Sequence, residues 1–187
     1  MRLQDKIGPR GVIEIVHRDA NGRNKRLWQE NRLGRWIRRT FGWDLKDIGL
    51  CGAWKDCLRF SNTITNVGHA AANGKMSNQG GYGTFTVQAI GIGTQGTPAT
   101  ATALASEITT GGGARGIAGT ISQVTTTVTN DTTSLVKTWT FTASFAVTEE
   151  GIFDNASSGG NMACYQSFSA VNVVSTDQLT VTHKYQT

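Results

Sequence analysis

The sequence predicts a mainly β protein, an antiparallel β-sandwich with an N-terminal β-hairpin and a short basic helix. The clearest observation is the segment 138–147, where hydroxyl side chains alternate with apolar or small ones, namely Trp139, Phe141, Ala143, Phe145 and Val147. Side chains on a strand point alternately to opposite faces, so we expect this segment to be one strand with one buried face. Short stretches of strand character separated by turns continue to the C-terminus, which favours a sandwich.

Strands are predicted along the C-terminal two thirds of the chain, near 84–92, 117–129, 134–147, 150–154, 161–168, 170–174 and 178–186. Residues 130–133 and 157–160 are rich in Asn, Asp, Ser, Thr and Gly, which is typical of turns. These turns would separate neighbouring strands of an antiparallel sheet.

The N-terminal third begins with a predicted hairpin. Residues 11–18 have strand character on both faces, and 24–30 would form the return strand. The pair Asn21-Gly22 between them suits a tight turn, because both residue types tolerate positive φ.

A short helix is expected to follow the hairpin. Asn31 is placed to cap it, the helix would run to about Phe41, and Gly42 would end it. Residues 43–60 fit either a broken helix or irregular packing, and a second short helix is expected over 66–76.

Charge divides the chain into two predicted domains. The whole sequence has 18 Lys and Arg against 13 Asp and Glu, a net charge of +5. Residues 1–60 hold 14 of the basic and 7 of the acidic residues, a net of +7, whereas 61–187 hold 4 and 6, a net of −2. We therefore expect a basic N-terminal docking module over 1–60 and a Thr-rich sandwich over 61–187, with an acidic partner for the first.

The candidate docking residues are arginines interleaved with two tryptophans, namely Arg23, Arg26, Trp28, Arg32, Arg35, Trp36, Arg38 and Arg39. Arg and Trp are frequent anchors of protein interfaces, so docking onto another protein is the preferred hypothesis. A solvated helix whose tryptophans pack on the body is the second interpretation. Nucleic acid, held by phosphate contacts and stacking, is the third.

No catalytic, cofactor or metal site is expected. Residues 91–96 match a dinucleotide-binding glycine pattern, but no parallel strand–helix unit follows, so a tight loop is preferred. Residues 111–116 could form an anion-binding nest, although a flexible connection into the next strand is favoured. Glu149 and Glu150 would point to opposite faces of a strand, and we expect them at a solvated strand end.

Histidine and cysteine give no ligand cluster either. Cys51 and Cys57 form a lone pair without the second pair that zinc requires, and His183 is expected to be a hydrogen-bonded histidine within the last strand. Three cysteines and a polar N-terminus favour cytosolic synthesis with free thiols. No apolar run reaches the ~18 residues of a membrane span, so no membrane partner is expected.

Residues 61–187 contain three sequence motifs whose order carries a resemblance to a known class of proteins. They are Asn-Thr-Ile-Thr-Asn-Val-Gly at 62–68, Ala-Ile-Gly-Ile-Gly-Thr at 89–94 with Thr-Ala-Leu-Ala-Ser-Glu-Ile at 102–108, and Thr-Glu-Glu-Gly-Ile-Phe at 148–153 with Gly-Gly-Asn-Met at 159–162 and Phe168. With them, the chain resembles bacteriophage virion structural proteins that have a Thr-rich β-sandwich. The resemblance implies a virion component without catalytic residues, of the tail, neck, fibre-associated or capsid-surface type.

We therefore expect a non-enzymatic structural protein, assembled in the host cytoplasm and carried in the virion. A neck, collar or tail adaptor or a fibre anchor is the first expectation. Capsid decoration is the alternative, and a small nucleic-acid-binding module is the second alternative. The expected partners are other virion proteins and further copies of this chain in a homo-oligomer, whereas nucleic acid and a small-molecule substrate are not expected.

Overall fold

The computed structural model describes residues 10–43, 45–93 and 98–186. The elements in chain order are β1 (Arg10–Arg18), β2 (Asn24–Lys25), β3 (Leu27–Glu30), α1 (Arg32–Phe41), β4 (Gly52–Lys55), β5 (Leu58–Ile64), α2 (Asn66–Ser77), β6 (Val87–Gly91), η1 (Pro98–Thr100), β7 (Gly116–Ile117), β8 (Thr120–Val124), β9 (Thr132–Thr140), β10 (Phe145–Phe153), β11 (Met162–Val173) and β12 (Gln178–Gln186).

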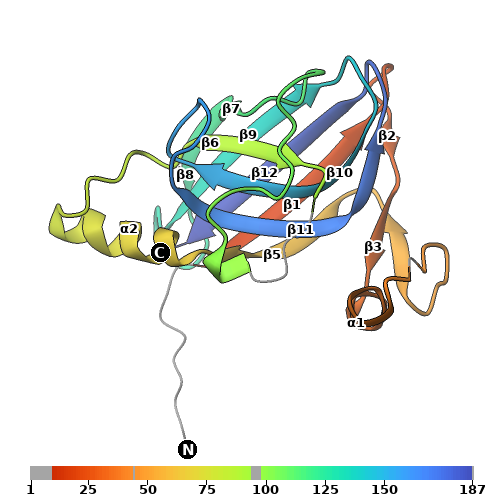
Figure 1. The fold of residues 1–187 in the computed structure, drawn as a ribbon, viewed down its shortest axis with the longest axis horizontal. Coiled ribbons are helices and arrows are strands. Elements are labelled where there is room, and N and C mark those ends of the chain that lie inside the picture. Colours follow the sequence, from red (N-terminus) through yellow and green to blue (C-terminus); the bar gives the residue numbers. More distant parts are fainter. Residues whose placement is uncertain (1–9, 44, 94–97, 187) are drawn as a thin grey trace, which may run out of the picture.

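One large antiparallel sheet dominates the fold, with its strands in the order β7-β6-β10-β11-β5-β1-β12-β9-β8. The sheet is curled, so that β6, β10 and β11 lie over β1, β12 and β9 (Figure 1). Its two end strands, β7 and β8, are separated in the chain only by Ala118 and Gly119. The chain thus passes directly from one edge of the sheet to the other. The predicted mainly β, sandwich-like fold is confirmed, in the form of a single sheet that nearly closes on itself.

The core lies between the two layers of this curled sheet. Its apolar side chains come from strands of both layers, among them Ile13, Leu58, Phe168, Val171, Leu179 and Val181. Trp139, Phe141 and Val147 belong to the same cluster, while Thr138 and Thr140 are exposed. The predicted division of faces is therefore confirmed for these residues, whereas Ala143, predicted on the buried face, is exposed and Phe145 is half-buried.

The same segment is not one strand, as the alternation predicted. β9 ends at Thr140 and pairs with β12, whereas β10 begins at Phe145 and pairs with β11 and β6. Between them the backbone N–H of Phe141 donates to the carbonyl oxygen of Asp177 (3.0 Å), and that of Thr142 donates to Gly111 (2.9 Å). The chain changes layers here, and its alternation persists because both layers bury their side chains in one core.

A glycine makes this crossing possible. Gly112 has φ +83°, and a Cβ on it would collide with the carbonyl oxygen of Thr140. Residues 111–112 form a turn packed against the crossing, and 113–115 lead into β7, so the predicted connection into the next strand is present. Three other strand predictions differ in detail. Within 117–129 the structure has the end of β7 and then β8, residues 150–153 are the end of β10, and 161–168 and 170–174 fall in the single strand β11.

The short elements of the N-terminal third agree with prediction in part. The turn after β1 forms as expected, with Gly22 at φ +76° and its N–H donating to the carbonyl oxygen of Asp19 (2.9 Å). The return strand splits, because only β2 pairs with β1, and β3 pairs with β4. Both predicted helices are present. Residues 43–60 contain turns and then two strands, β4 and the first half of β5, instead of a broken helix.

The sheet includes part of the predicted N-terminal module. β1 lies between β5 and β12 near the middle of the sheet, so a division at residue 60 does not separate two folding units. The segment that stands outside the sheet is shorter. It consists of residues 26–57, with β3, α1 and β4, and we call it the side module (Figure 1).

Replacing Phe141 with Ala should lower the free energy of unfolding by about 3–5 kcal/mol, because the ring is 1% exposed at the layer crossing. Urea denaturation of the two proteins measures this difference. Thr140→Ala, one residue away on the solvent face, is the control and should change it by no more than about 0.5 kcal/mol. A loss below about 1 kcal/mol for Phe141→Ala would contradict the assignment of this residue to the core.

Candidate docking surface

Within the side module, the paired strands β3 and β4 form the base for the helix α1. Trp28 is buried, its ring lies 5.8 Å from that of Trp54 in an edge-on arrangement, and Arg26 donates to the carbonyl oxygen of Trp54 (3.0 Å). These contacts hold β3 and β4 together. Trp28 and Arg26, two of the predicted docking residues, therefore take part in the internal structure of the module.

Two sets of contacts fix α1 to this base, one at the start of the helix and one in its second turn. Asn31 caps it by accepting from the N–H of Gly34 (3.0 Å), and its amide nitrogen donates to the carbonyl oxygen of Leu50 (2.7 Å). Arg38 donates to the buried carboxylate of Glu30 at 2.9 and 3.1 Å. Arg38 is thus a third predicted docking residue with an internal partner.

The remaining predicted residues have different positions. Arg23 is exposed in the turn after β1, and Arg32 and Trp36 are exposed on α1. Arg35 is half-buried beside a cleft, described below. The side chain of Arg39 lies outside the described part of the chain. The predicted cluster of eight residues is therefore divided between the inside of the module and its surface.

An exposed row of aromatic rings lies on the outer side of the module. Trp36, Phe41 and Trp43 are 55%, 53% and 62% exposed. The ring centroids of Trp36 and Phe41 are 5.7 Å apart, and those of Phe41 and Trp43 are 5.4 Å apart. We call these three residues the aromatic row. Exposed aliphatic side chains of the same module are Leu33, Ile48 and Leu50.

The interpretation in which the tryptophans pack on the body agrees with the buried Trp28 and is wrong for Trp36, which is exposed in the aromatic row. The apolar stripe of α1 faces solvent, while the helix approaches the module through Gly34, where a Cβ would collide with the carbonyl oxygen of Cys51. Sequence reasoning included Trp36 but missed Phe41 and Trp43. The available signal was the helical spacing of apolar residues. This spacing shows that the helix has an apolar face, but not whether that face packs on the protein or is exposed to solvent.

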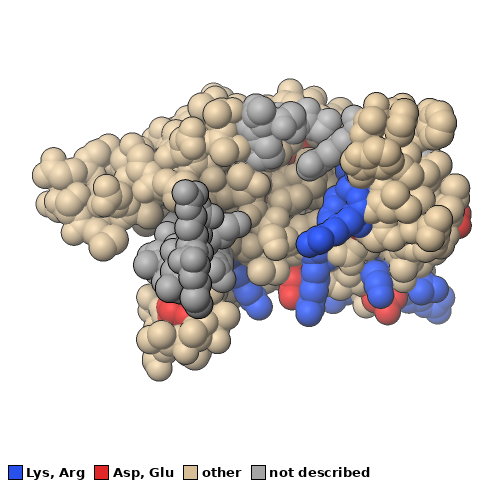
Figure 2. Space-filling view, turned by 90° about the horizontal axis from the view of Figure 1, so that it is seen from below, with Lys and Arg blue, Asp and Glu red and all other residues tan. Residues whose placement is uncertain are grey.

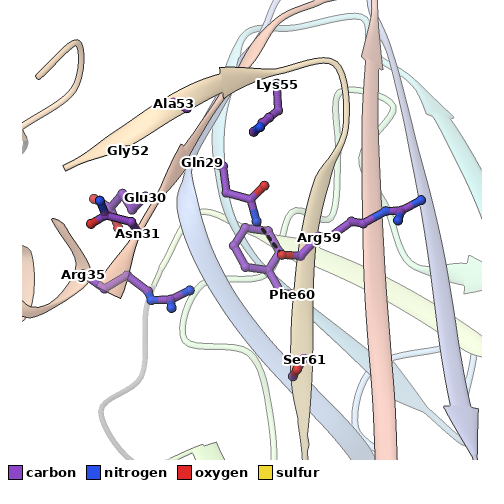
Figure 3. A pocket seen from close by; sticks show the side chains of 10 residues that line it. All are labelled: Gln29, Glu30, Asn31, Arg35, Gly52, Ala53, Lys55, Arg59, Phe60 and Ser61. Carbon is purple, nitrogen blue, oxygen red and sulfur yellow. Dashed lines mark hydrogen bonds between the residues drawn. The ribbon is translucent and has the colours of Figure 1, made fainter. Parts of the chain in front are cut away.

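A cleft of about 530 Å³ lies between the side module and β5, and its lining residues are Gln29, Glu30, Asn31, Arg35, Gly52, Ala53, Lys55, Arg59, Phe60 and Ser61. Figure 3 shows the side chain of Arg35 reaching toward the ring of Phe60, while that of Arg59 points away from the cleft. Arg59 is paired with Glu14 at 3.0 Å. Within the described residues, no acidic group is paired with Arg35 or Lys55.

Basic side chains gather at this end of the molecule. Figure 2 shows Lys and Arg, with a few acidic residues between them, on the half of one face that carries the side module. The half toward α2 has none in this view. On this face, the folded surface thus has the asymmetry of charge that the sequence predicts.

The two adjacent glutamates were expected at a solvated strand end, and this was wrong. Glu149 and Glu150 are both fully buried, and they point to opposite sides of β10 as predicted. The carboxylate of Glu149 accepts from the N–H groups of Ala105 (3.0 Å) and Ser106 (2.8 Å) and from the hydroxyl of Tyr165 (3.2 Å). It holds the loop that follows the glycine pattern of 91–96, so the described part of this pattern surrounds a carboxylate and is unsuited to phosphate.

Glu150 lies in the core beside His183. The Nδ1 of His183 is 3.1 Å from both carboxylate oxygens, and burial would lower its pKa, but the charge of Glu150 and the nearby Cys164 outweigh burial and raise the pKa of His183 to about 10. The amide nitrogen of Asn62 lies 2.7 Å from Nε2, and the amide oxygen has no partner in this orientation. A charged imidazole donates from both nitrogens, so the opposite orientation of this amide would satisfy both groups.

This cluster contains a thiol, an imidazole and a carboxylate, but its members are buried. A nucleophile must reach its substrate, so we assign the cluster a structural part. Arg115 is also internal, since its guanidinium pairs with Glu107 and stacks on Phe153, with 4.1 Å from its central carbon to the ring centroid.

The described residues contain no group of three or more His, Cys, Asp or Glu side chains that could hold a metal ion. Cys51, Cys57 and Cys164 are free thiols. No helix in the described ranges has the length and apolar character needed to cross a membrane. Comparisons with family models, curated proteins and solved structures found no match for this chain.

The pKa of His183 predicts how stability depends on pH. Because the pKa in the folded protein lies above the ordinary value of 6.5, the stabilisation is complete below pH 6.5 and is lost as the pH rises toward 10. The difference in free energy of unfolding between the wild type and the double variant Glu150→Gln/His183→Gln, which removes both members of the pair, should therefore shrink between these values, as urea denaturation can measure. His69→Gln, at an exposed position on α2, is the control. A difference that stays constant over this range would contradict the charged pair.

Proposed function

We propose that this chain is a non-enzymatic structural protein of a bacteriophage particle, and that it docks onto the particle through the side module. The observation that carries the proposal is the aromatic row. Three adjacent rings that are each more than half exposed form a costly apolar surface unless a partner covers them. Trp, Phe and Arg are also the residue types enriched in the cores of protein interfaces.

The rest of the molecule supports this proposal because it is built as a scaffold. In the described part of the chain, the curled sheet buries three apolar clusters, and buried carboxylates join its strands and loops. The resemblance of residues 61–187 to virion structural proteins supports a phage particle as the place where the chain assembles. We place the chain at the neck, collar or tail, as an adaptor or fibre anchor, with capsid decoration as the alternative.

We also propose that several copies assemble in the virion. Among the residues that the structure describes, β8 pairs only with β9, and all of its residues except Val124 are exposed. An open strand edge of this kind is commonly covered by another chain in a symmetric assembly. Docking onto nucleic acid has less support, because the guanidinium of Arg38 is paired with the buried Glu30 and that of Arg26 is hydrogen-bonded to the carbonyl oxygen of Trp54.

Replacing Trp36 and Phe41 together with Ser should reduce incorporation into particles at least about tenfold, because an interface anchor is commonly worth 2 kcal/mol or more. The variant is supplied in cells that produce the particles, and gradient-purified particles are examined by mass spectrometry. Circular dichroism checks that the variant is folded.

Met76→Ser is the matched control, because Met76 is 89% exposed on α2 at the opposite end of the molecule. It should be incorporated like the wild type. Absence of the wild-type chain from particles would refute the proposed function, and normal incorporation of the double variant would refute the role of the aromatic row. The position of the chain in images of the particle separates the neck or tail from the capsid surface.

A further inference from the structure

The cleft beside the side module exposes an unpaired edge of β5. The ladder between β5 and β11 covers only Thr63 and Ile64, opposite Tyr165 and Cys164. The other edge of β5 is paired with β1 along residues 58–62. Toward the cleft, residues 59–61 have no neighbouring strand among the described residues, and all three line the cleft.

The backbone groups at this edge point into the opening. The N–H of Thr65 donates to the carbonyl oxygen of Ala163 in β11, and the carbonyl oxygen of Arg59 accepts from the side chain of Gln29 (2.6 Å). Backbone groups of alternate residues in a strand point to the same neighbour. Ser61, two residues after Arg59 and four before Thr65, belongs to the same alternation and therefore directs its N–H and carbonyl oxygen toward the cleft.

The charge of the cleft is positive and is not neutralised from within. Glu30 is the acidic lining residue, and its carboxylate is occupied by Arg38 at 2.9 Å. Arg59 is paired with Glu14. This leaves Arg35 and Lys55, on two different elements of the side module, as cations that face the cleft without an acidic partner in the described ranges.

The cleft does not offer a free ring for stacking. Phe60, the aromatic residue of its lining, is stacked on Phe168 at a centroid distance of 5.8 Å. Binding of single-stranded nucleic acid relies on rings that can stack on bases, so this cleft fits a polypeptide better.

We propose that the cleft binds an extended acidic segment of a partner protein as an added strand along residues 59–61 of β5. The backbone of the segment pairs with Ser61, and two of its carboxylates meet Arg35 and Lys55. Alternate side chains of a strand share a face, so the carboxylates belong at every second position. This inference rests on the proposed docking function, for which it names the chemistry of the partner.

The experiment uses the full chain and a pooled library of blocked octapeptides with Glu at every second position and Val, Ile, Thr or Tyr between. A matched library has Gln in place of Glu. At physiological salt, the protein should retain Glu peptides at least about tenfold more than Gln peptides, since charge-assisted hydrogen bonds are roughly twice as strong as neutral ones. A retained peptide is then synthesised for titration.

Arg35→Gln and Lys55→Gln should each weaken binding of that peptide about tenfold, whereas Arg23→Gln should change it less than about twofold, because Arg23 is exposed outside the cleft. N-methylation at alternate positions should abolish binding in one register and leave it in the other, as strand addition requires.

Equal retention of both libraries, equal losses for all three variants, or preferred binding of a single-stranded oligonucleotide would each overturn the inference. Peptide binding by a chain that is absent from particles would refute the proposed function and leave this inference intact. Incorporation of the chain into particles without peptide binding would refute this inference and leave the proposed function intact.

Discussion

The buried pair of Glu150 and His183 joins the two layers of the molecule. Glu150 belongs to β10 and His183 to β12, which are separated by three strands along the curled sheet. A buried charge without its partner costs several kcal/mol, so any curl or register that separated these two groups would be strongly disfavoured. The pair thus constrains the closure of the sheet more specifically than apolar contacts do, because apolar contacts have no direction.

Other buried polar groups of the sheet are likewise bound to internal partners, whereas most of the residues proposed for docking lie in the side module. Glu149 orders a loop, Arg115 is paired with Glu107, and the thiol of Cys164 is enclosed beside His183. These ionisable side chains thus stabilise the curled sheet itself. The unpaired cations and exposed rings discussed above belong instead to residues 26–57, which contribute little to the main core.

Local features of the fold could be predicted from the sequence, and features that depend on distant partners could not. Asn31 and Gly42 mark the ends of α1 because capping is a short-range effect. The burial of Glu150 depends on His183, 33 residues away, which no local pattern reveals. The layer crossing at 141–144 was missed because period-2 alternation is the same on both sides of it. The position of α1 was missed because an apolar stripe does not tell whether the chain itself or a partner covers it.

The side module enters and leaves the sheet at neighbouring strands. The chain departs after β2 and returns at Leu58, which lies opposite Ile15 of β1. The module is therefore a long insertion in the connection between the antiparallel strands β1 and β5. The sheet holds the two ends of this insertion close together. Under the proposed docking function, most residues that would contact the partner therefore lie in one continuous insertion, and most residues that form the curled sheet lie outside it.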